Sequence, residues 1–299
     1  MVAIVKLKRI VIIAIKLVLI AAALMLFLTI SVYYLNFGRR FGVNQGFVRY
    51  AHRQTSFYSG QNRLNGFIFG EDNDKGLIVI SHGLGGGGLS YLREIRFFVD
   101  SGWRVFTFDK TASYTSEGRG TRGLPQSAID LNAALNYIKS QEWELPIMLY
   151  GHSWGGYAVT AVLNFDHDIC AVVSIAGFAG PMIMLQEAAR VMMGPFGNLA
   201  RPYLWALQQV LFGNYAGLCA VEGINRAGIP VMLIHGQADN VVSYSGAGII
   251  AQGERINNPY VLFVSRYYPD FSGHNDVMLD HSLLVDVHDF FARSLLLQN

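Results

Sequence analysis

A serine stands alone between glycines in the segment Leu149–Leu163, LYGHSWGGYAVTAVL. The residues before Gly151 are typical of a buried strand, and those after Gly155 are typical of an apolar helix. A G-x-S-x-G sequence between a strand and a helix places its serine on a tight, strained turn that lifts the hydroxyl above the sheet. The start of the helix points N–H groups and a positive dipole end at the same spot, so an oxyanion formed there would be stabilised. Ser153 is therefore a candidate nucleophile.

A serine hydroxyl is a poor nucleophile near neutral pH and needs a base within hydrogen-bond reach. His274 suits that role because Gly273 and Asn275 place it in a loop. A carboxylate must then fix the tautomer of the imidazole and stabilise its charged form. Asp239 is the best candidate for this carboxylate, since it lies just past the end of a predicted buried strand.

Other titratable residues compete with these candidates. His281 and His288 fall in or near the last predicted helix, where an exposed helix face explains them. Asp270 and Asp276 flank His274, but both are typical of solvated loop carboxylates. Three further histidines lie at strand ends, and we interpret them as packing or supporting residues: His82, His152 and His235.

Short apolar segments that alternate with helical patterns predict βαβ units and a mostly parallel sheet covered on both faces. In such a sheet ligands bind outside the carboxyl ends of the strands, which is where the candidate residues fall. A first strand is expected within residues 41–60. The other predicted strands are Arg63–Phe69, Leu77–Ile80, Arg104–Phe108, Ile147–Tyr150, Ala171–Ile175, Val231–Ile234 and Val261–Val264, and the predicted helices are Pro125–Ser140, Tyr157–Leu163 and His281–Leu297.

More than fifty residues between Ile175 and Pro230 contain no convincing strand, but Met182–Met193 and Pro202–Phe212 have helical patterns. This interval is too long for a structureless connection, so we expect residues 178–226 to form a small helical cap over the sheet. Its apolar side chains are first of all candidates for core, although flexible thioethers also suit an adaptable apolar cleft. The candidate pocket residues are Met182, Met184, Met192 and Trp205.

The residues from Leu17 to Phe37 carry no charge, and about 20 apolar residues suffice to cross a bilayer. The pair Tyr33 and Tyr34 suits an interfacial aromatic belt. We therefore expect residues 1–40 to be a single-pass transmembrane anchor, with a cleaved signal peptide and a buried core helix as alternatives. The tighter basic cluster before the span predicts that the catalytic domain, residues 41–299, lies on the extracytoplasmic side. The flanking basic residues are Lys6, Lys8, Arg9 and Lys16 before the span and Arg39, Arg40, Arg49 and Arg53 after it.

Four segments, GHSWGG, SHGLGGGG, HGQAD and SGHND, together resemble the α/β-hydrolase superfamily, in particular its single-domain serine esterases, lipases and peptidases. The resemblance covers about residues 50–297. It implies Ser153 as nucleophile, Asp239 as acid and His274 as base, in the chain order that this fold uses. The oxyanion hole would consist of the backbone N–H groups of Leu84 and Trp154.

One segment departs from the superfamily pattern. Lys110, Thr111 and Ala112 follow Asp109 where many relatives have a glycine-rich turn, which leaves the shape of one pocket wall open. The glycines after His82 are not followed by G-K-[ST], so a nucleotide-binding loop is disfavoured.

The residues together predict a membrane-anchored serine hydrolase that cleaves carboxylic esters, with lipophilic acyl groups, through an acyl-enzyme on Ser153. A serine peptidase or amidase of the aminopeptidase-like branch is the alternative, because the same nucleophile serves both reactions. A catalytically silent binding protein with this fold is less favoured, since all three triad candidates are present.

The composition predicts no cofactor, metal or nucleic-acid partner. Neither Cys170 nor Cys219 lies in a CxxC or Cys/His context that would indicate zinc. Whether the two cysteines pair stays open. The formal net charge is +2, and Lys and Arg do not cluster with aromatic residues, so no nucleic-acid footprint is present.

Overall fold

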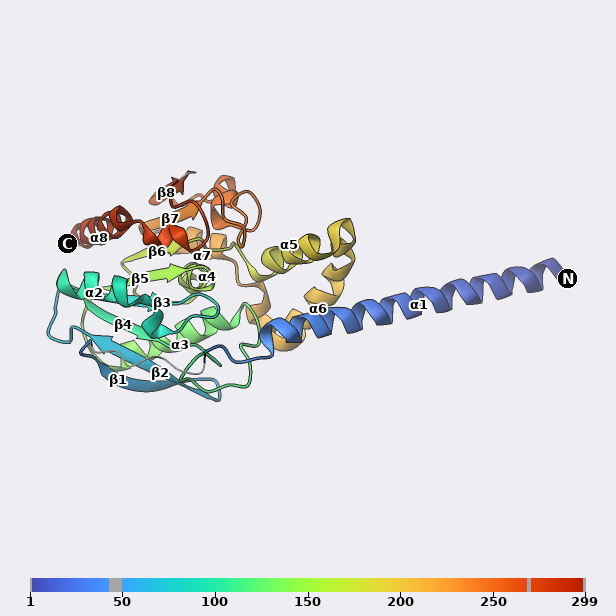
Figure 1. The fold of residues 1–299 in the computed structure, drawn as a ribbon, viewed down its shortest axis with the longest axis horizontal. Coiled ribbons are helices and arrows are strands. Elements are labelled where there is room, and N and C mark those ends of the chain that lie inside the picture. The colour runs from blue at the N-terminus through green and yellow to red at the C-terminus, as the bar shows by residue number, and fades with distance from the viewer. Residues whose placement is uncertain (1, 43–49, 268–269, 298–299) are drawn as a thin grey trace.

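Eight strands form one sheet in the order β1-β2-β4-β3-β5-β6-β7-β8 in the computed structural model, which describes residues 2–42, 50–267 and 270–297 (Figure 1). The β1–β2 and β2–β4 pairs are antiparallel and all other neighbours are parallel, which confirms the mostly parallel α/β sheet. Part of the interval in which the first strand was expected, residues 43–49, lies outside the described chain. The strands are β1 (Arg53–Ser59), β2 (Asn62–Phe69), β3 (Leu77–Ser81), β4 (Arg104–Phe108), β5 (Ile147–His152), β6 (Ala171–Ile175), β7 (Val231–Gly236) and β8 (Val261–Arg266).

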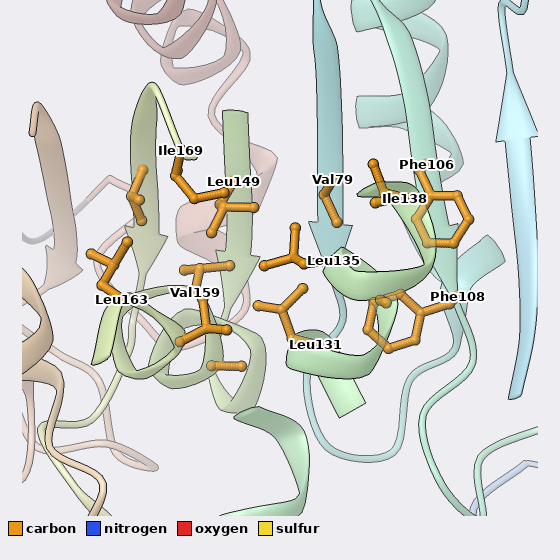
Figure 2. Packing of buried hydrophobic residues seen from close by; sticks show 14 of the residues in the cluster. Val79, Phe106, Phe108, Leu131, Leu135, Ile138, Leu149, Val159, Leu163 and Ile169 are labelled. Carbon is orange, nitrogen blue, oxygen red and sulfur yellow. The ribbon is translucent and has the colours of Figure 1, made fainter. Parts of the chain in front are cut away.

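Helices cover both faces of this sheet. One face packs against α3 (Gln126–Ser140), α4 (Trp154–Ala161) and α7 (Ala220–Ala227). There, Val79 and Leu149 of the strands meet Leu135 of α3 (Figure 2). The other face packs against α2 (Leu92–Asp100) and α8 (His281–Leu296). The parallel strands read as unbroken apolar runs because both of their faces are buried, as β3 and β6 are throughout.

Two helices of the chain segment between β6 and β7 stand away from the sheet, on the side from which α1 leaves (Figure 1). They are α5 (Pro181–Met193) and α6 (Arg201–Phe212), and their bounds differ from the predicted ones by one residue at the first position. Pro181 and Pro202 lie in the first turns, where proline is well tolerated. Short 3-10 segments complete the fold: Gly88–Tyr91, Val162–Asn164, Gly194–Ala200, Gly213–Gly217, Ile249–Arg255 and Asp276–Leu279.

The amino-terminal helix α1 (Val2–Phe37) projects from the domain, while the carboxyl terminus lies at the opposite end (Figure 1). By length and composition, Ile4–Phe37 is one helix that could cross a membrane, with a mean hydropathy of 3.0. Its last turns pack against the protein instead of projecting. Tyr33 is only 3% exposed, so the expected interfacial role of this residue is wrong, whereas Tyr34 is 52% exposed.

Hydrogen bonds attach this end of α1 to two other parts of the chain. The hydroxyl of Tyr33 donates to the carbonyl of Arg122 at 2.9 Å and accepts from the side-chain amide of Gln208 on α6 at 2.8 Å. Phe37 joins the same apolar cluster as Leu204 of α6 and Trp154 of α4. The end of α1 is therefore part of the folded domain.

Candidate active site

Ser153 occupies the sharp turn between β5 and α4. Its backbone has φ of 57° and ψ of −116°, a strained conformation for a residue with a side chain, which costs about 1–3 kcal/mol. The glycines on either side allow this turn. A Cβ atom at Gly155 would collide with the carbonyl oxygen of Ser81, and one at Gly151 would collide with the carbonyl of Gly155. The close approach of helix and strand therefore holds the serine hydroxyl above the sheet.

The structure brings Ser153, Asp239 and His274 together from the ends of three strands. Nδ1 of His274 lies 2.7 Å from Oδ2 of Asp239, and its Nε2 lies 2.8 Å from Oγ of Ser153. Because Nδ1–H donates to the carboxylate, Nε2 is left to accept the hydroxyl proton. In the described chain, neither Asp270 nor Asp276 is hydrogen-bonded to the imidazole of His274.

Asp239 is held as a carboxylate by several donors. Its Oδ1 accepts the N–H groups of Val241 and Val242, both at 2.8 Å. Its Oδ2 faces His274 and also Nε2 of His235, at 3.2 Å. Burial raises the pKa of Asp239, but the hydrogen bonds from His235 and His274 outweigh burial and hold the pKa well below its ordinary value. His235 is thus a supporting residue for the carboxylate.

A chain of hydrogen bonds links the loop after β3 to the loop that carries His274. The N–H of Gly83 donates to the hydroxyl of Tyr91 at 3.0 Å, and this hydroxyl lies 3.1 Å from Nδ1 of His152. Nε2 of His152 in turn donates to the carbonyl of His274 at 2.9 Å. Burial lowers the pKa of His152 to about 4, so its imidazole is neutral at pH 7 and Nδ1 accepts from Tyr91.

The two residues expected to supply the oxyanion-hole N–H groups are Trp154, which directly follows Ser153, and Leu84, in the loop after β3. Trp154 is the first residue of α4, where an N–H has no partner within the helix. Within the described chain, the N–H of Leu84 donates to no other group, whereas those of Gly83 and Gly86 in the same loop are hydrogen-bonded. Leu84 and Trp154 line one cavity together with Ser153 and His274.

Lys110 lies beneath both of these positions and is fully buried. Its Nζ donates to the carbonyl of His82 and to Ser127, whose hydroxyl donates to the carbonyl of Trp154 at 3.0 Å. The nitrogen also lies 4.7 Å from the centre of the Trp154 ring. Sequence reasoning identified this segment only as a departure from the superfamily. The structure shows that it connects the β3 loop to the serine turn.

The cavity above Ser153 has a volume of about 620 Å³. Of the candidate pocket residues, Met184 lines it. Met182 packs in the apolar cluster beneath the cap, Met192 lines a second cavity beside α1, and Trp205 is 57% exposed. Glu94 is the only carboxylate among the described residues that line the main cavity, and burial raises its pKa.

Neither a metal site nor a disulfide is found in the part of the chain that the structure describes. No group of three or more His, Cys, Asp or Glu side chains there is arranged to hold a metal ion. Cys170 and Cys219 are not joined by a disulfide in the same ranges.

Residues 72–214 match the model of the serine aminopeptidase family S33. The chain is 25% identical over 199 residues to the lysophosphatidylserine lipase ABHD12 of Danio rerio, a match covering 63% of this chain and 50% of that protein. It is 24% identical over 180 residues to the uncharacterized protein YfhR of Escherichia coli O157:H7, covering 58% and 56% of the two chains. The matches therefore span about half the length of these curated relatives.

The fold itself is similar to solved hydrolase structures. The Pyrococcus furiosus esterase Pf2001 superposes with a TM-score of 0.66 at 20% identity, covering 86% of this chain and 98% of the esterase. At this identity the likeness establishes the arrangement of strands and helices.

Proposed function

We propose that this chain is a serine hydrolase of the α/β-hydrolase superfamily that cleaves carboxylic esters with lipophilic acyl groups. The observation that carries the proposal is the hydrogen-bonded series from Asp239 through His274 to Ser153, with 2.7 Å and 2.8 Å between the contacting atoms. Such a series activates a hydroxyl that would otherwise be a weak nucleophile.

In the proposed reaction, Oγ of Ser153 attacks the ester carbonyl carbon while Nε2 of His274 takes the hydroxyl proton. The tetrahedral oxyanion is stabilised by the N–H groups of Leu84 and Trp154. His274 then gives its proton to the departing alcohol, which leaves an acyl-enzyme. A water molecule, deprotonated by His274, attacks the acyl carbon, and the carboxylic acid leaves as Ser153 regains its proton.

The nature of the cavity supports a lipophilic acyl group. Apolar side chains such as Leu124, Phe178 and Met184 line it beside Ser153. The lipase name of one curated relative agrees with this assignment. Met184 is unbranched and adaptable, which suits acyl chains of different shapes.

The test is covalent labelling with a fluorophosphonate probe, which reacts with activated serines. Wild-type protein should be labelled, and Ser153→Ala should abolish both labelling and hydrolysis of p-nitrophenyl esters, a loss of about 10⁴-fold or more. The exposed Ser140 offers a control, since Ser140→Ala should keep wild-type labelling. An unlabelled, folded wild-type protein would favour a catalytically silent scaffold instead.

A second candidate function is cleavage of peptide or amide bonds. The match to the serine aminopeptidase family favours it, and Glu94 supplies a carboxylate in the cavity that could bind an amine. Hydrolysis of aminoacyl p-nitroanilides faster than p-nitrophenyl esters, and its loss in Glu94→Gln, would replace the ester assignment with this one.

We also propose that α1 is an uncleaved membrane anchor, with the hydrolase domain, residues 41–299, on the extracytoplasmic side. The apolar helix Ile4–Phe37 and the basic residues near its start support this topology. Protease added to intact cells should then digest the domain. Protection of the domain until the cells are opened would place it inside.

A further inference from the structure

A second cavity, of about 340 Å³, lies between α1 and α5 and adjoins the cavity above Ser153. Leu84, Leu124 and Met184 line both cavities, so one set of side chains separates the serine from the second space. We refer to this second cavity as the α1–α5 groove. Its remaining walls are Met25, Leu28, Thr29, Val32, Tyr33, Asn36 and Phe37 of α1, Leu185, Ala188, Ala189, Met192 and Met193 of α5, and Ala200 and Leu204 beyond them.

The α1–α5 groove is suited to hydrocarbon. Most of its lining is aliphatic or methionine side chains. Two of the polar residues among them have their own partners: the hydroxyl of Tyr33 donates to the carbonyl of Arg122, and the amide of Asn36 donates to the carbonyl of Val32. At this volume the groove is too narrow for a helix, whose diameter with side chains is about 10–12 Å.

The length of α1 places the cap against a membrane. The uncharged run Leu17–Phe37 is about 31 Å long at 1.5 Å per residue, close to the 30 Å or so of a bilayer core. One face of its last part packs against the domain from Thr29 onwards, through the buried residues Thr29, Tyr33 and Phe37, and the part that is free on all sides, Leu17–Leu28, is only about 18 Å long. Extending the span towards the amino terminus would put Lys16 in hydrocarbon, which is costly. The membrane-spanning part of α1 can therefore extend to Phe37 only if the cap lies within the adjacent leaflet of the bilayer.

The exposed surface of the cap also suits a position within the leaflet. The cap helices α5 and α6 lie on the side of the domain from which α1 leaves (Figure 1). Large apolar side chains on these helices are exposed, among them Val191 of α5 at 82% and Val210 of α6 at 84%. Phe196 and Leu199 add to them, at 69% and 57%. All four belong to one segment of the cap, residues 191–210, and so many exposed large apolar side chains in one segment are typical of a surface that meets another apolar phase.

We propose that the α1–α5 groove takes one acyl chain of a membrane lipid directly from the leaflet, so that α1 forms a wall of the substrate site. This inference rests on the proposed ester hydrolysis and specifies its substrate class as a lipid with a hydrocarbon acyl chain. The chain lies between α1 and α5, its ester carbonyl reaches Ser153 past Leu84 and Met184, and the headgroup side stays in the main cavity. The reaction is hydrolysis of the acyl C–O bond by water, as above.

A bulky residue in the groove should separate long from short substrates. Ala188 lines the groove and is exposed on its other side, and Val191 lies one turn further along α5 and lines neither cavity. Full-length protein in phosphatidylcholine vesicles is assayed with p-nitrophenyl palmitate and acetate. Ala188→Trp should lower kcat/KM for palmitate at least tenfold and leave acetate within twofold, whereas Val191→Trp should change neither.

Photocrosslinking gives a readout that does not depend on turnover. A long-chain alkyl fluorophosphonate with a terminal diazirine is attached to Ser153 and irradiated in the same vesicles. Adducts should map to groove residues of α1 and α5, such as Met25, Val32 and Met193. Adducts confined to other elements, or equal effects of the two tryptophan variants on palmitate hydrolysis, would overturn the proposal that the groove binds the acyl chain. Acetate hydrolysis would in that case still support the proposed ester hydrolysis. A wild-type protein that neither reacts with the probe nor hydrolyses the acetate ester would overturn both the groove proposal and the proposed ester hydrolysis.

Discussion

Nε2 of His152 donates a hydrogen bond of 2.9 Å to the backbone carbonyl of His274, so the residue before the serine holds the loop that carries the imidazole. The two rings also lie 5.0 Å apart, centre to centre. Through Tyr91, the same histidine is connected to Gly83, which precedes the Leu84 N–H group. One neutral side chain therefore sets the positions of the base and of the loop on the other side of the serine.

We expect His152 to act as a positioning residue. His152→Ala should lower kcat for a short p-nitrophenyl ester about 10²-fold with KM within twofold, because the His274 loop shifts relative to Ser153. His152→Gln retains an N–H donor for the carbonyl of His274 and should recover most of that loss. Steady-state kinetics on both variants make the comparison. Equal losses in the two variants, with equally reduced Tm, would point to a packing role alone.

Replacing the carboxylate tests the orientation of the base. Asp239→Asn should lower kcat about 10⁴-fold with little change in KM, because an amide favours the imidazole tautomer that cannot accept the proton of Ser153. Asp270→Asn is the matched control, since Asp270 is exposed and near His274 in sequence. A loss in the Asp270 variant comparable to that in the Asp239 variant would contradict the assignment.

Lys110 should make stability depend on pH. Burial lowers the pKa of Lys110 well below its ordinary value of 10.5, and the nearby Asp130 carboxylate offsets part of this effect. Because the pKa is lower in the folded chain, protonation favours unfolding, so Lys110 costs stability as pH falls below 10.5 and costs none above it. Relative to Lys110→Met, wild-type protein should gain up to about 1.4 kcal/mol per pH unit as pH rises towards that value.

Thermal unfolding of the two proteins between pH 7 and pH 10 measures this difference. A difference in unfolding free energy that does not change over this range would refute the prediction. The same variant should lose activity about tenfold, because the contacts that connect His82 to the Trp154 carbonyl are weakened.

Gly155 packs so closely against β3 that we expect no side chain to fit at this position. Gly155→Ala should destabilise the protein by about 3 kcal/mol or more, because its methyl group would meet the backbone carbonyl of Ser81. Gly217→Ala serves as control, since a Cβ there has nothing within 4 Å. Denaturant unfolding of both variants tests this, and equal stabilities would contradict the packing described here.

The parallel sheet could be predicted because its strands are buried on both faces and therefore read as short, unbroken apolar runs. Two helices were not predicted from the sequence. Helix α2 is only nine residues long and carries Arg93, Glu94 and Arg96 among its apolar positions, and α7 has eight residues with Gly223 near its centre. Short helices of this kind form because tertiary packing outweighs their weak local preference.

The triad candidates were found from their types and order at strand ends, which the fold class predicts. The contact of His152 with His274 joins residues 122 positions apart, and no local spacing encodes it. Lys110 is similar, since a buried lysine is recognisable only once its partners surround it. The pocket residues show a further limit: helical periodicity groups Met184 with Met192, but it does not say which cavity each one lines.

The hydrogen bonds of Tyr33 have a practical implication for preparing this protein. Cutting the chain after residue 40, a common way to obtain a water-soluble fragment of an anchored enzyme, would remove Tyr33 and Phe37 from the interior. The side-chain amide of Gln208 would lose its hydrogen-bond acceptor, and the apolar side chains of Ala200 and Leu204 would be exposed to water. Such a fragment should aggregate, so purification has to begin with detergent or lipid and the intact chain.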